Sequence, residues 1–229
     1  MSATGRNLEG NERHADDFYE TPAWCTRAIL PHLGTPIGFD PETGRTKRQP
    51  PKTVLDAGCG TGAILRACGG FWSAYDQQLI GIEKDVGRVR QANEHEAYPD
   101  SDLYFECGDF FDVKGDCFEI SPQLNPVRMP FDLVISNPPY GDAEKFVEHA
   151  LTIGRTCCFL LRLNWLASKK RAAFHRAHPS DVFVLPRRPS FTNGGTDATE
   201  YAWFVWGPTD VEECLNGGFR GNRWFLLDV

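Results

Sequence analysis

Short apolar runs alternate with helical patterns through the middle of the chain. Four runs are each followed by a segment of helical periodicity: 53–56 by 63–68, 79–83 by 85–95, 131–136 by 143–153, and 156–161 by 165–177. A further apolar run covers 103–106, and the last two, 182–185 and 201–206, have no helix between them and should pair antiparallel. The pattern predicts an α/β fold with a doubly wound, mostly parallel, seven-stranded sheet whose last strand is antiparallel.

The regions outside these runs suggest how the chain is divided. Residues 1–17 are polar and are expected to form a flexible N-terminal arm. The main domain is predicted to cover 18–207, with Gly- and Pro-rich loop insertions at about 34–52 and 112–130. Residues 208–229 would then form a C-terminal extension.

The composition is that of a soluble globular domain. The chain has 229 residues, 41% of them hydrophobic, and no apolar run approaches the roughly 20 residues that span a bilayer. The polar N-terminus lacks the apolar centre of a signal peptide, so we expect no membrane association and a cytoplasmic location. The eight cysteines contain no C-x-x-C pair, which favours reduced thiols over disulfides or zinc ligands.

Charge is distributed unevenly along the chain. The formal net charge is −7, yet the segment from Arg162 to Arg188 holds seven basic residues and one acidic residue, Asp181. Such a segment is typical of a contact with a polyanion, although a solvated helix face has the same composition. His175 and His178 have an H-x-x-H spacing but no evident carboxylate or thiol partner, so no metal is expected.

A glycine-rich turn follows the first strand of the repeating pattern. Asp56, Gly58 and Gly60 belong to the sequence DAGCGTG, in which the glycines let the backbone turn sharply and approach a ligand. The next strand ends in Glu83, an acid placed to accept hydrogen bonds from two ribose hydroxyls. The turn resembles the first motif of class I S-adenosylmethionine-dependent methyltransferases, which implies a Rossmann-like fold of that class and this cofactor, with Asp56, Gly58, Gly60 and Glu83 as cofactor-binding residues.

The same resemblance extends to the third strand, which runs into Asp109 and Phe110. In this family the matching Asp accepts a hydrogen bond from the adenine amine of the cofactor. The neighbouring apolar residue packs on the adenine ring. The resemblance therefore adds Asp109 and Phe110 to the cofactor-binding residues.

The fourth strand ends in the sequence Asn137-Pro138-Pro139-Tyr140. Two consecutive prolines make this turn stiff, and it offers the side-chain carbonyl of Asn137 and the backbone carbonyl of Pro138. The two oxygens can accept both hydrogens of an exocyclic amine, which directs the nitrogen lone pair toward a methyl donor and stabilises its developing positive charge. Tyr140 provides a planar face for a substrate ring.

With this motif the chain resembles the N6-adenine DNA methyltransferases, especially the small bacteriophage type. Tyr19, Thr21 and Pro22 match the family's Tyr-x-Thr-Pro, which lies near the methionine end of the cofactor; Pro22 also suits the first position of a helix. The resemblance implies a flipped adenine between Tyr140 and Phe191, with Pro139 beside it. Phosphate contacts would come from four basic residues of the segment described above: Lys169, Lys170, Arg171 and Arg188. DNA is the implied partner, and a phage-encoded enzyme would act in the host cytoplasm.

Several alternatives stay open at this point. RNA adenine methylation uses the same amine chemistry, and protein glutamine N5-methyltransferases share the Asn-Pro-Pro-Tyr motif. A catalytically silent nucleic-acid-binding subunit is a third alternative, although both motifs are intact. Because the chain offers no long target-recognition segment, we expect short or relaxed sequence specificity, or help from a specificity partner or homodimer.

Overall fold

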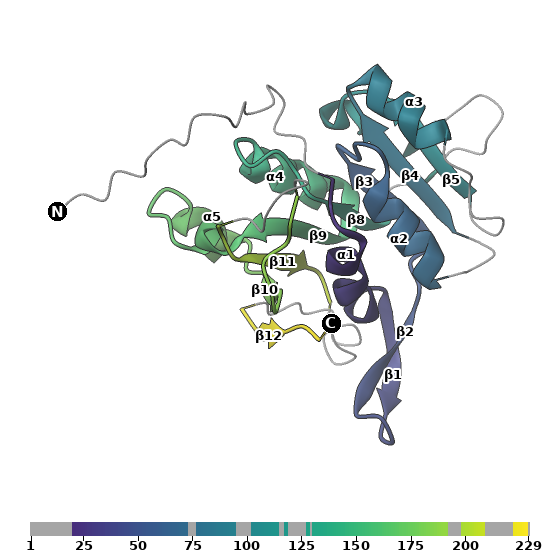
Figure 1. The fold of residues 1–229 in the computed structure, drawn as a ribbon. Coiled ribbons are helices and arrows are strands. Elements are labelled where there is room, and N and C mark those ends of the chain that lie inside the picture. Colours follow the sequence, from purple (N-terminus) through teal and green to yellow (C-terminus); the bar gives the residue numbers. More distant parts are fainter. Residues whose placement is uncertain are drawn as a thin grey trace.

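The computed structural model describes residues 20–72, 77–94, 102–114, 117–118, 127–128, 130–191, 198–208 and 222–228. Its main element is an eight-stranded sheet in the order β12-β10-β11-β9-β8-β3-β4-β5 (Figure 1). The strands are β3 (Thr53–Ala57), β4 (Gln78–Glu83), β5 (Asp102–Cys107), β8 (Phe131–Ser136), β9 (Gly154–Arg162), β10 (Asp181–Val184), β11 (Tyr201–Trp206) and β12 (Trp224–Leu226). All neighbours pair parallel except β11, which is antiparallel to both β9 and β10. The doubly wound, mostly parallel sheet predicted from the sequence is confirmed.

Helices cover both faces of the sheet. α1 (Ala23–Ile29) and α2 (Ala63–Trp72) pack on one face, and α4 (Ala143–Ile153) and α5 (Ala172–Ala177) pack on the other. α3 (Val86–Glu94) lies beside α2, where the Arg66 guanidinium donates to the Ala92 carbonyl across 2.6 Å (Figure 1). The chain thus forms three layers around two cores.

Strand β11 shows why the two cores form. All six of its residues are buried; Tyr201 and Trp203 belong to the core beneath α1 and α2, whereas Phe204 and Trp206 belong to the core beneath α4 and α5. Successive side chains of a strand point to opposite faces, so a strand apolar at every position requires cover on both sides.

The eighth strand comes from the predicted C-terminal extension. β12 pairs in parallel with β10, and the guanidinium of Arg223 forms an ion pair with buried Asp181 (Nη2–Oδ2 2.6 Å). The ring of Phe225 stacks on that of Phe183 with 4.5 Å between centroids. The sheet therefore continues beyond residue 207 and has one strand more than the sequence pattern predicted.

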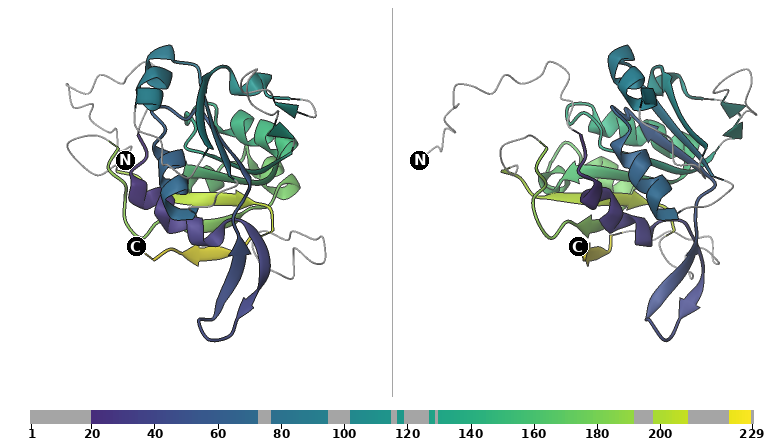
Figure 2. Two further views of the ribbon diagram at one scale, coloured as in Figure 1. Left: turned by 90° about the vertical axis from the view of Figure 1, so that its right-hand side faces the viewer. Right: turned by 45° about the vertical axis from the view of Figure 1, so that its right-hand side comes forward.

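The insertion expected to be a loop at 34–52 is instead a β-hairpin. Strands β1 (Thr35–Asp40) and β2 (Arg45–Gln49) pair antiparallel and extend away from the main sheet (Figure 2). Ile37 and Phe39 alternate with polar or small residues, as in a strand. Both side chains are exposed in the structure, so the alternation does not mark a buried face. Within the second insertion, β6 (Cys117–Phe118) and β7 (Val127–Arg128) pair antiparallel.

Helix boundaries also differ from the sequence-based expectation. α1 begins at Ala23, after Pro22, and continues into the 3₁₀ helix η1 (Leu30–His32). The helix expected over 165–177 is divided into the 3₁₀ helix η3 (Leu163–Leu166) and α5. Across the turn between them, Arg171 Nε donates to the Trp165 carbonyl over 2.9 Å.

The described part of the chain has no helix long and apolar enough to cross a membrane. Nor do its residues include a group of three His, Cys, Asp or Glu side chains placed to hold a metal ion. The cysteines whose side chains are described are free thiols: Cys25, Cys59, Cys68, Cys107, Cys157 and Cys158. Burial raises the pKa of Cys25 to about 12, so this thiol stays protonated.

Candidate cofactor and substrate site

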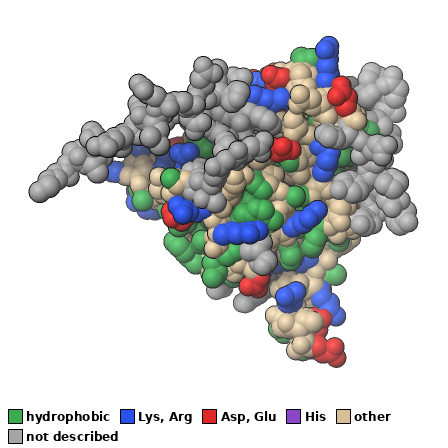
Figure 3. Space-filling model, in the orientation of Figure 1, with side chains coloured by type: hydrophobic (Ala, Val, Ile, Leu, Met, Phe, Trp, Pro, Cys, Tyr) green, Lys and Arg blue, Asp and Glu red, His purple; other side chains and the backbone are tan. Residues whose placement is uncertain are grey.

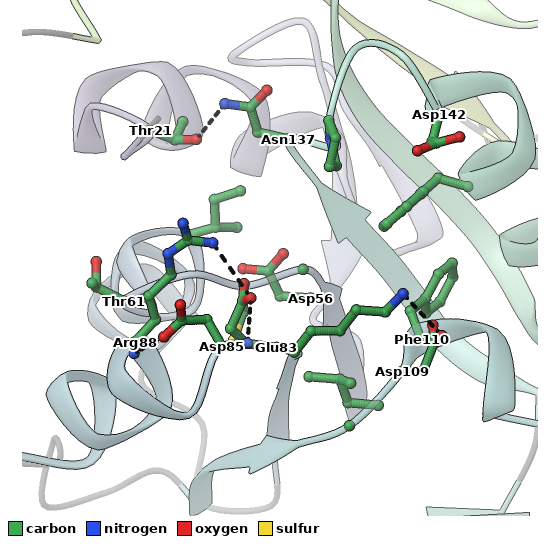
Figure 4. A pocket seen from close by; sticks show the side chains of 18 of the residues that line it. Thr21, Asp56, Thr61, Glu83, Asp85, Arg88, Asp109, Phe110, Asn137 and Asp142 are labelled. Carbon is green, nitrogen blue, oxygen red and sulfur yellow. Dashed lines mark hydrogen bonds and ion pairs between the residues drawn. The ribbon is translucent and has the colours of Figure 1, made fainter. Parts of the chain in front are cut away.

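A cavity of about 580 Å³ opens at the carboxyl ends of the central parallel strands. Strand ends of β3, β4 and β8 contribute Asp56, Glu83 and Asn137, and the segment after β5 contributes Asp109 (Figure 4). The carboxyl ends of parallel strands meet at one edge of a sheet, so residues distant in sequence line one cavity. Its volume lies in the range of about 300–1,000 Å³ that is usual for small-ligand sites.

The glycine-rich turn forms one wall of the cavity. Gly58, Gly60 and Gly62 all have positive φ (71°, 55° and 87°), a conformation that L-residues with side chains rarely adopt. The amides of Gly58 and Cys59 donate to the carbonyl of Ile82 across 2.8 and 3.0 Å. The turn is thereby held against the end of β4, with α2 starting immediately after it.

Asp56 is a buried carboxylate on the wall of this cavity. Its side chain is 1% exposed, and neither carboxylate oxygen has a hydrogen-bond partner among the described residues. Burial, reinforced by the nearby charge of Glu83, raises the pKa of Asp56 well above 3.8. A ligand carrying positive charge or a hydrogen-bond donor would supply the missing partner.

Glu83 ties the glycine-rich turn to the end of β4. Its Oε2 accepts from the Gly60 amide (2.9 Å) and its Oε1 from the Asp85 amide (3.0 Å), with the Arg88 guanidinium 3.6 Å from Oε1. A carboxylate has about four acceptor positions, so these contacts leave capacity for a ligand hydroxyl. Glu83 is therefore both a support for the turn and a candidate acceptor.

Asp109 and Phe110 line the cavity on the side away from Thr61 and Arg88 (Figure 4). Asp109 caps the 3₁₀ helix η2 (Phe110–Asp112) by accepting from the Phe111 amide (3.0 Å), and its Oδ2 lies 2.9 Å from Lys84 Nζ. Burial alone would raise the pKa of Asp109, but hydrogen bonds from Lys84 and Phe111 outweigh it and lower the pKa. Phe110 is 3% exposed and stacks on Phe146 with 5.1 Å between centroids.

Asn137 lies at the end of β8 and is held by the start of α1. Its Nδ2 donates to the Thr21 hydroxyl across 3.0 Å, and its Oδ1 is buried without a hydrogen-bond partner among the described residues (Figure 4). Neighbouring Ser136 donates its hydroxyl to the Ala57 carbonyl across 2.5 Å, which links β8 to the glycine-rich turn. The amide of Asn137 therefore has a fixed orientation and one oxygen left to accept a donor.

The aromatic residues of the predicted substrate site lie beyond Asn137. Tyr140 and Phe191 both contact the ring of Tyr201, with centroid distances of 5.9 and 5.1 Å. The Arg162 guanidinium lies 4.4 Å from the Tyr140 ring centroid, and its Nε donates to the Tyr201 hydroxyl. Tyr201 thus connects the two rings that the sequence analysis assigned to the substrate base.

Comparison with solved structures places this architecture among known folds. A putative RNA methyltransferase from Pyrococcus horikoshii superposes with a TM-score of 0.51 at 18% identity, over 69% of this chain and 76% of that one. The methyltransferase subunit of a type I restriction-modification system from Streptococcus thermophilus gives 0.53 at 15% identity, over 84% and 45%. A predicted O-methyltransferase from Agrobacterium tumefaciens gives 0.51 at 16% identity, over 89% and 84%.

The chain has the class I methyltransferase fold. Comparison of the sequence with protein-family models and with curated proteins finds no match, so the likeness is one of structure. The substrates in the names of the similar structures differ, and the fold alone does not select among them.

In this methyltransferase fold, most predicted cofactor residues line the one cavity: Thr21, Asp56, Gly58, Glu83, Asp109, Phe110 and Asn137. Gly60 is not among the lining residues; its amide donates a hydrogen bond to the Glu83 carboxylate. Pro139 also lines the cavity, whereas Pro138 is buried within the turn. Tyr19 lies outside the described residues.

The predicted phosphate-binding residues do not form a single surface. Three of them, Lys169, Lys170 and Arg171, precede α5 on the α4–α5 face of the sheet. The guanidinium of Arg171 donates a hydrogen bond to the Trp165 carbonyl. Arg188 follows β10 and precedes Phe191, which packs in the core on the α1–α2 face. The basic segment at 162–188 crosses the sheet, so its charge is divided between the two faces.

Five charged residues that line the cavity were not predicted from the sequence: Glu20, Lys84, Asp85, Arg88 and Asp142. Lys84 reaches Asp109, Arg88 reaches Glu83, and Glu20 accepts from the Thr61 hydroxyl across 3.3 Å. Glu20 lies between the two residues that match the Tyr-x-Thr-Pro motif, and Lys84 follows Glu83 directly. For Glu20 and Lys84, the position within or beside a motif was the sequence signal that could have identified them.

Proposed function

We propose that this protein transfers a methyl group from S-adenosylmethionine to the N6 amine of adenine in DNA. The proposal is carried by the Asn137 amide. Its Nδ2 donates to Thr21, and its Oδ1, which has no hydrogen-bond donor among the described residues, belongs to a residue that lines the same cavity as Asp56 and Glu83. An exocyclic amine offers the donor that this oxygen lacks.

The residues of the cavity suit the proposed cofactor. S-adenosylmethionine would supply the methyl group as a sulfonium. Asp56 would pair with a cationic group of the cofactor, Glu83 would accept from its ribose hydroxyls, and Asp109 would accept from its adenine amine once Lys84 moves aside. Gly58 adopts a positive φ and, because glycine has no Cβ, its backbone forms a wall of the cavity with no side chain in the way.

Asn137 and Pro138 are proposed to bind the target amine. Asn137 Oδ1 and the Pro138 carbonyl would accept its two N–H groups, holding the nitrogen lone pair toward the methyl group. As the N–C bond forms and the bond between the methyl carbon and the sulfonium sulfur breaks, leaving a neutral thioether, these oxygens would stabilise the positive charge on nitrogen, which would then lose a proton to solvent. Tyr140 and Phe191 would contact the extruded base, because a base inside a duplex cannot reach the cavity.

Two of the similar structures are named for nucleic-acid systems, but the fold does not select a substrate, so the acceptor is tested directly. The test is transfer of labelled methyl groups to duplex DNA, structured RNA and a release-factor protein. We expect label at adenine N6 of DNA. Label only in RNA or only in the protein would establish the corresponding alternative, and no transfer to any acceptor would support a non-catalytic subunit.

The same assay with Asn137→Ala tests the mechanism. We expect loss of transfer with nearly unchanged affinity for the cofactor, measured by calorimetry. Asn164→Ala is the matched control, because Asn164 is an exposed asparagine in η3 outside the cavity. Transfer at the wild-type rate by Asn137→Ala would refute the assignment.

A further inference from the structure

A second cavity, of about 440 Å³, adjoins the first. It lies between α1, α2 and the segment that follows β10, and its lining includes Arg27, Arg66, Ser190 and Phe191. Glu20, Thr21 and Ala63 line both cavities. Since Thr21 also accepts from Asn137, the second cavity begins one side chain away from the proposed position of the target amine.

Arg27 of α1 lines this cavity, and two further arginines, Arg187 and Arg188, precede its lining residues Ser190 and Phe191 along the chain. Trp24 and Arg27 are three residues apart on α1 and are therefore neighbours on its surface. The Arg187 guanidinium lies 4.4 Å from the Trp24 ring centroid, which brings the segment after β10 against α1. We call Arg27, Arg187 and Arg188 the α1 basic rim.

The charges of this rim are available to a ligand. Arg27 and Arg188 are exposed, and neither forms an ion pair with a residue that the structure describes. Arg66, by contrast, already donates to the Thr61 and Ala92 carbonyls. Glu20 is the one carboxylate among the described lining residues, and it lies at the boundary with the first cavity, where it accepts from Thr61.

The surface combines guanidinium groups with aromatic rings. Figure 3 shows Lys and Arg side chains set among hydrophobic ones on this side of the molecule. In a chain of net charge −7, the exposed guanidinium groups of Arg27 and Arg188, close in sequence to Trp24 and Phe191, favour a polyanion that also carries planar rings. A nucleic-acid strand has both features: phosphates for the arginines and bases for the rings.

We infer that the α1 basic rim and the second cavity hold the strand that flanks the target nucleotide. This inference rests on the proposed function and adds a binding surface to it. The strand runs across α1, with phosphates on Arg27 and Arg188, and enters the cofactor cavity past Thr21. Lys169 and Lys170, on the opposite face of the sheet, lie off this path.

The experiment measures nucleic-acid affinity without methyl transfer, so it is independent of catalysis. Wild type and variants are titrated with a labelled adenine-containing oligonucleotide, as single-stranded DNA, duplex DNA or RNA, at several salt concentrations. The double variant Arg27→Gln/Arg188→Gln removes two exposed charges from the rim. Arg45→Gln/Lys47→Gln is its matched control, since it removes two exposed charges from the β1–β2 hairpin.

Each lost phosphate contact lowers the slope of log K against log salt by about 0.7 on a single strand and about 0.9 on a duplex. We therefore expect the rim variant to bind several-fold more weakly and to lose about 1.5 units of slope, while the hairpin control keeps the wild-type slope. Comparing the three oligonucleotides shows whether the flanking strand is DNA or RNA.

The inference is overturned if the rim variant keeps the wild-type slope, if the hairpin control loses as much, or if Lys169→Gln/Lys170→Gln loses more. It is also overturned if the wild type binds none of the oligonucleotides. Wild-type methyl transfer to DNA with an unchanged rim-variant slope would remove the inference and leave the proposed function standing. Absence of methyl transfer with a reduced slope would refute the proposed function and leave the α1 basic rim as a nucleic-acid-binding surface.

Discussion

The amide nitrogen of Asn137 donates to the hydroxyl of Thr21 across 3.0 Å and joins residues 116 positions apart in the chain. The bond connects the end of β8 to the start of α1, so the segment before the first helix determines how the amide of the Asn-Pro-Pro-Tyr turn is oriented. Thr21 is 4% exposed, so its hydroxyl has little contact with bulk solvent.

Thr21→Val tests this orientation. The substitution keeps the shape of the side chain but leaves Asn137 Nδ2 without its acceptor, at a cost of about 0.5–1.5 kcal/mol. We expect a two- to tenfold slower single-turnover methyl transfer, roughly that energy in the barrier. Thr21→Ser retains the hydroxyl and should stay close to wild type. A loss in Thr21→Ser together with wild-type transfer in Thr21→Val would show that the methyl group, and not the hydrogen bond, matters.

Asp56→Asn should stabilise the protein without cofactor and weaken cofactor binding. Burial raises the pKa of Asp56, so above about pH 4 the folded protein retains a proton that the unfolded chain has released. The contribution of Asp56 to stability therefore falls as pH rises from the unfolded pKa toward the folded one.

The measurement is denaturant unfolding of Asp56→Asn at several pH values between about 5 and 8. We expect a shallower decline in the free energy of unfolding than in wild type, and a melting temperature higher by about 2–4 °C for each kcal/mol regained. Asp112→Asn, at an exposed position, is the control. An unchanged pH dependence in Asp56→Asn would contradict the prediction.

Glu83→Gln should weaken cofactor binding and also loosen the end of β4. The single amide oxygen can still accept from Gly60, but the NH2 group cannot accept from the Asp85 amide, and hydrogen bonds from ribose hydroxyls to a neutral acceptor are weaker than those to a carboxylate. We expect a cofactor Kd about tenfold higher by calorimetry. Glu94→Gln, at the exposed end of α3, should bind like wild type. A tenfold change in both would point to net charge as the cause.

Gly62→Ala should destabilise the chain. Gly62 has φ of 87°, and a Cβ there would lie 2.3 Å from Phe105 Cζ. Backbone strain of this kind costs on the order of 1–3 kcal/mol, to be measured by denaturant unfolding. Gly38→Ala, where an added Cβ has no neighbour within 4 Å, is the control. A free energy of unfolding equal to that of Gly38→Ala would be inconsistent with the strain.

Sequence specificity is expected to be short or relaxed. The described insertions are a β-hairpin and a short strand pair, too small for a separate target-recognition domain. Mapping N6-methyladenine across all sequence contexts after treatment of random DNA measures this. Strict dependence on a motif of about six base pairs or more by the isolated chain would contradict the prediction. Strictness that requires an added protein would identify a specificity partner.

The chain's local patterns determined the layered fold and the edge where the candidate site lies. Apolar runs of strand length, each followed by helical periodicity, specify a parallel sheet, and the strand ends then place Asp56, Glu83, Asp109 and Asn137 together. This inference succeeded because it needs only local periodicity and the rule that parallel strands share one carboxyl edge.

Other features were decided by contacts between distant segments. The side chains of the β1–β2 hairpin are mostly exposed, so its alternation is short and does not mark a buried face. Strand β12 begins at Trp224, well after β11 ends at Trp206, and is held in the sheet by Arg223 and Phe225. The faces on which Lys169 and Arg188 lie depend on how β10 and α5 pack, which sequence spacing does not encode. Tertiary packing alone brought Thr21 to Asn137 and Arg187 to Trp24, because side-chain contacts across the chain depend on the completed core.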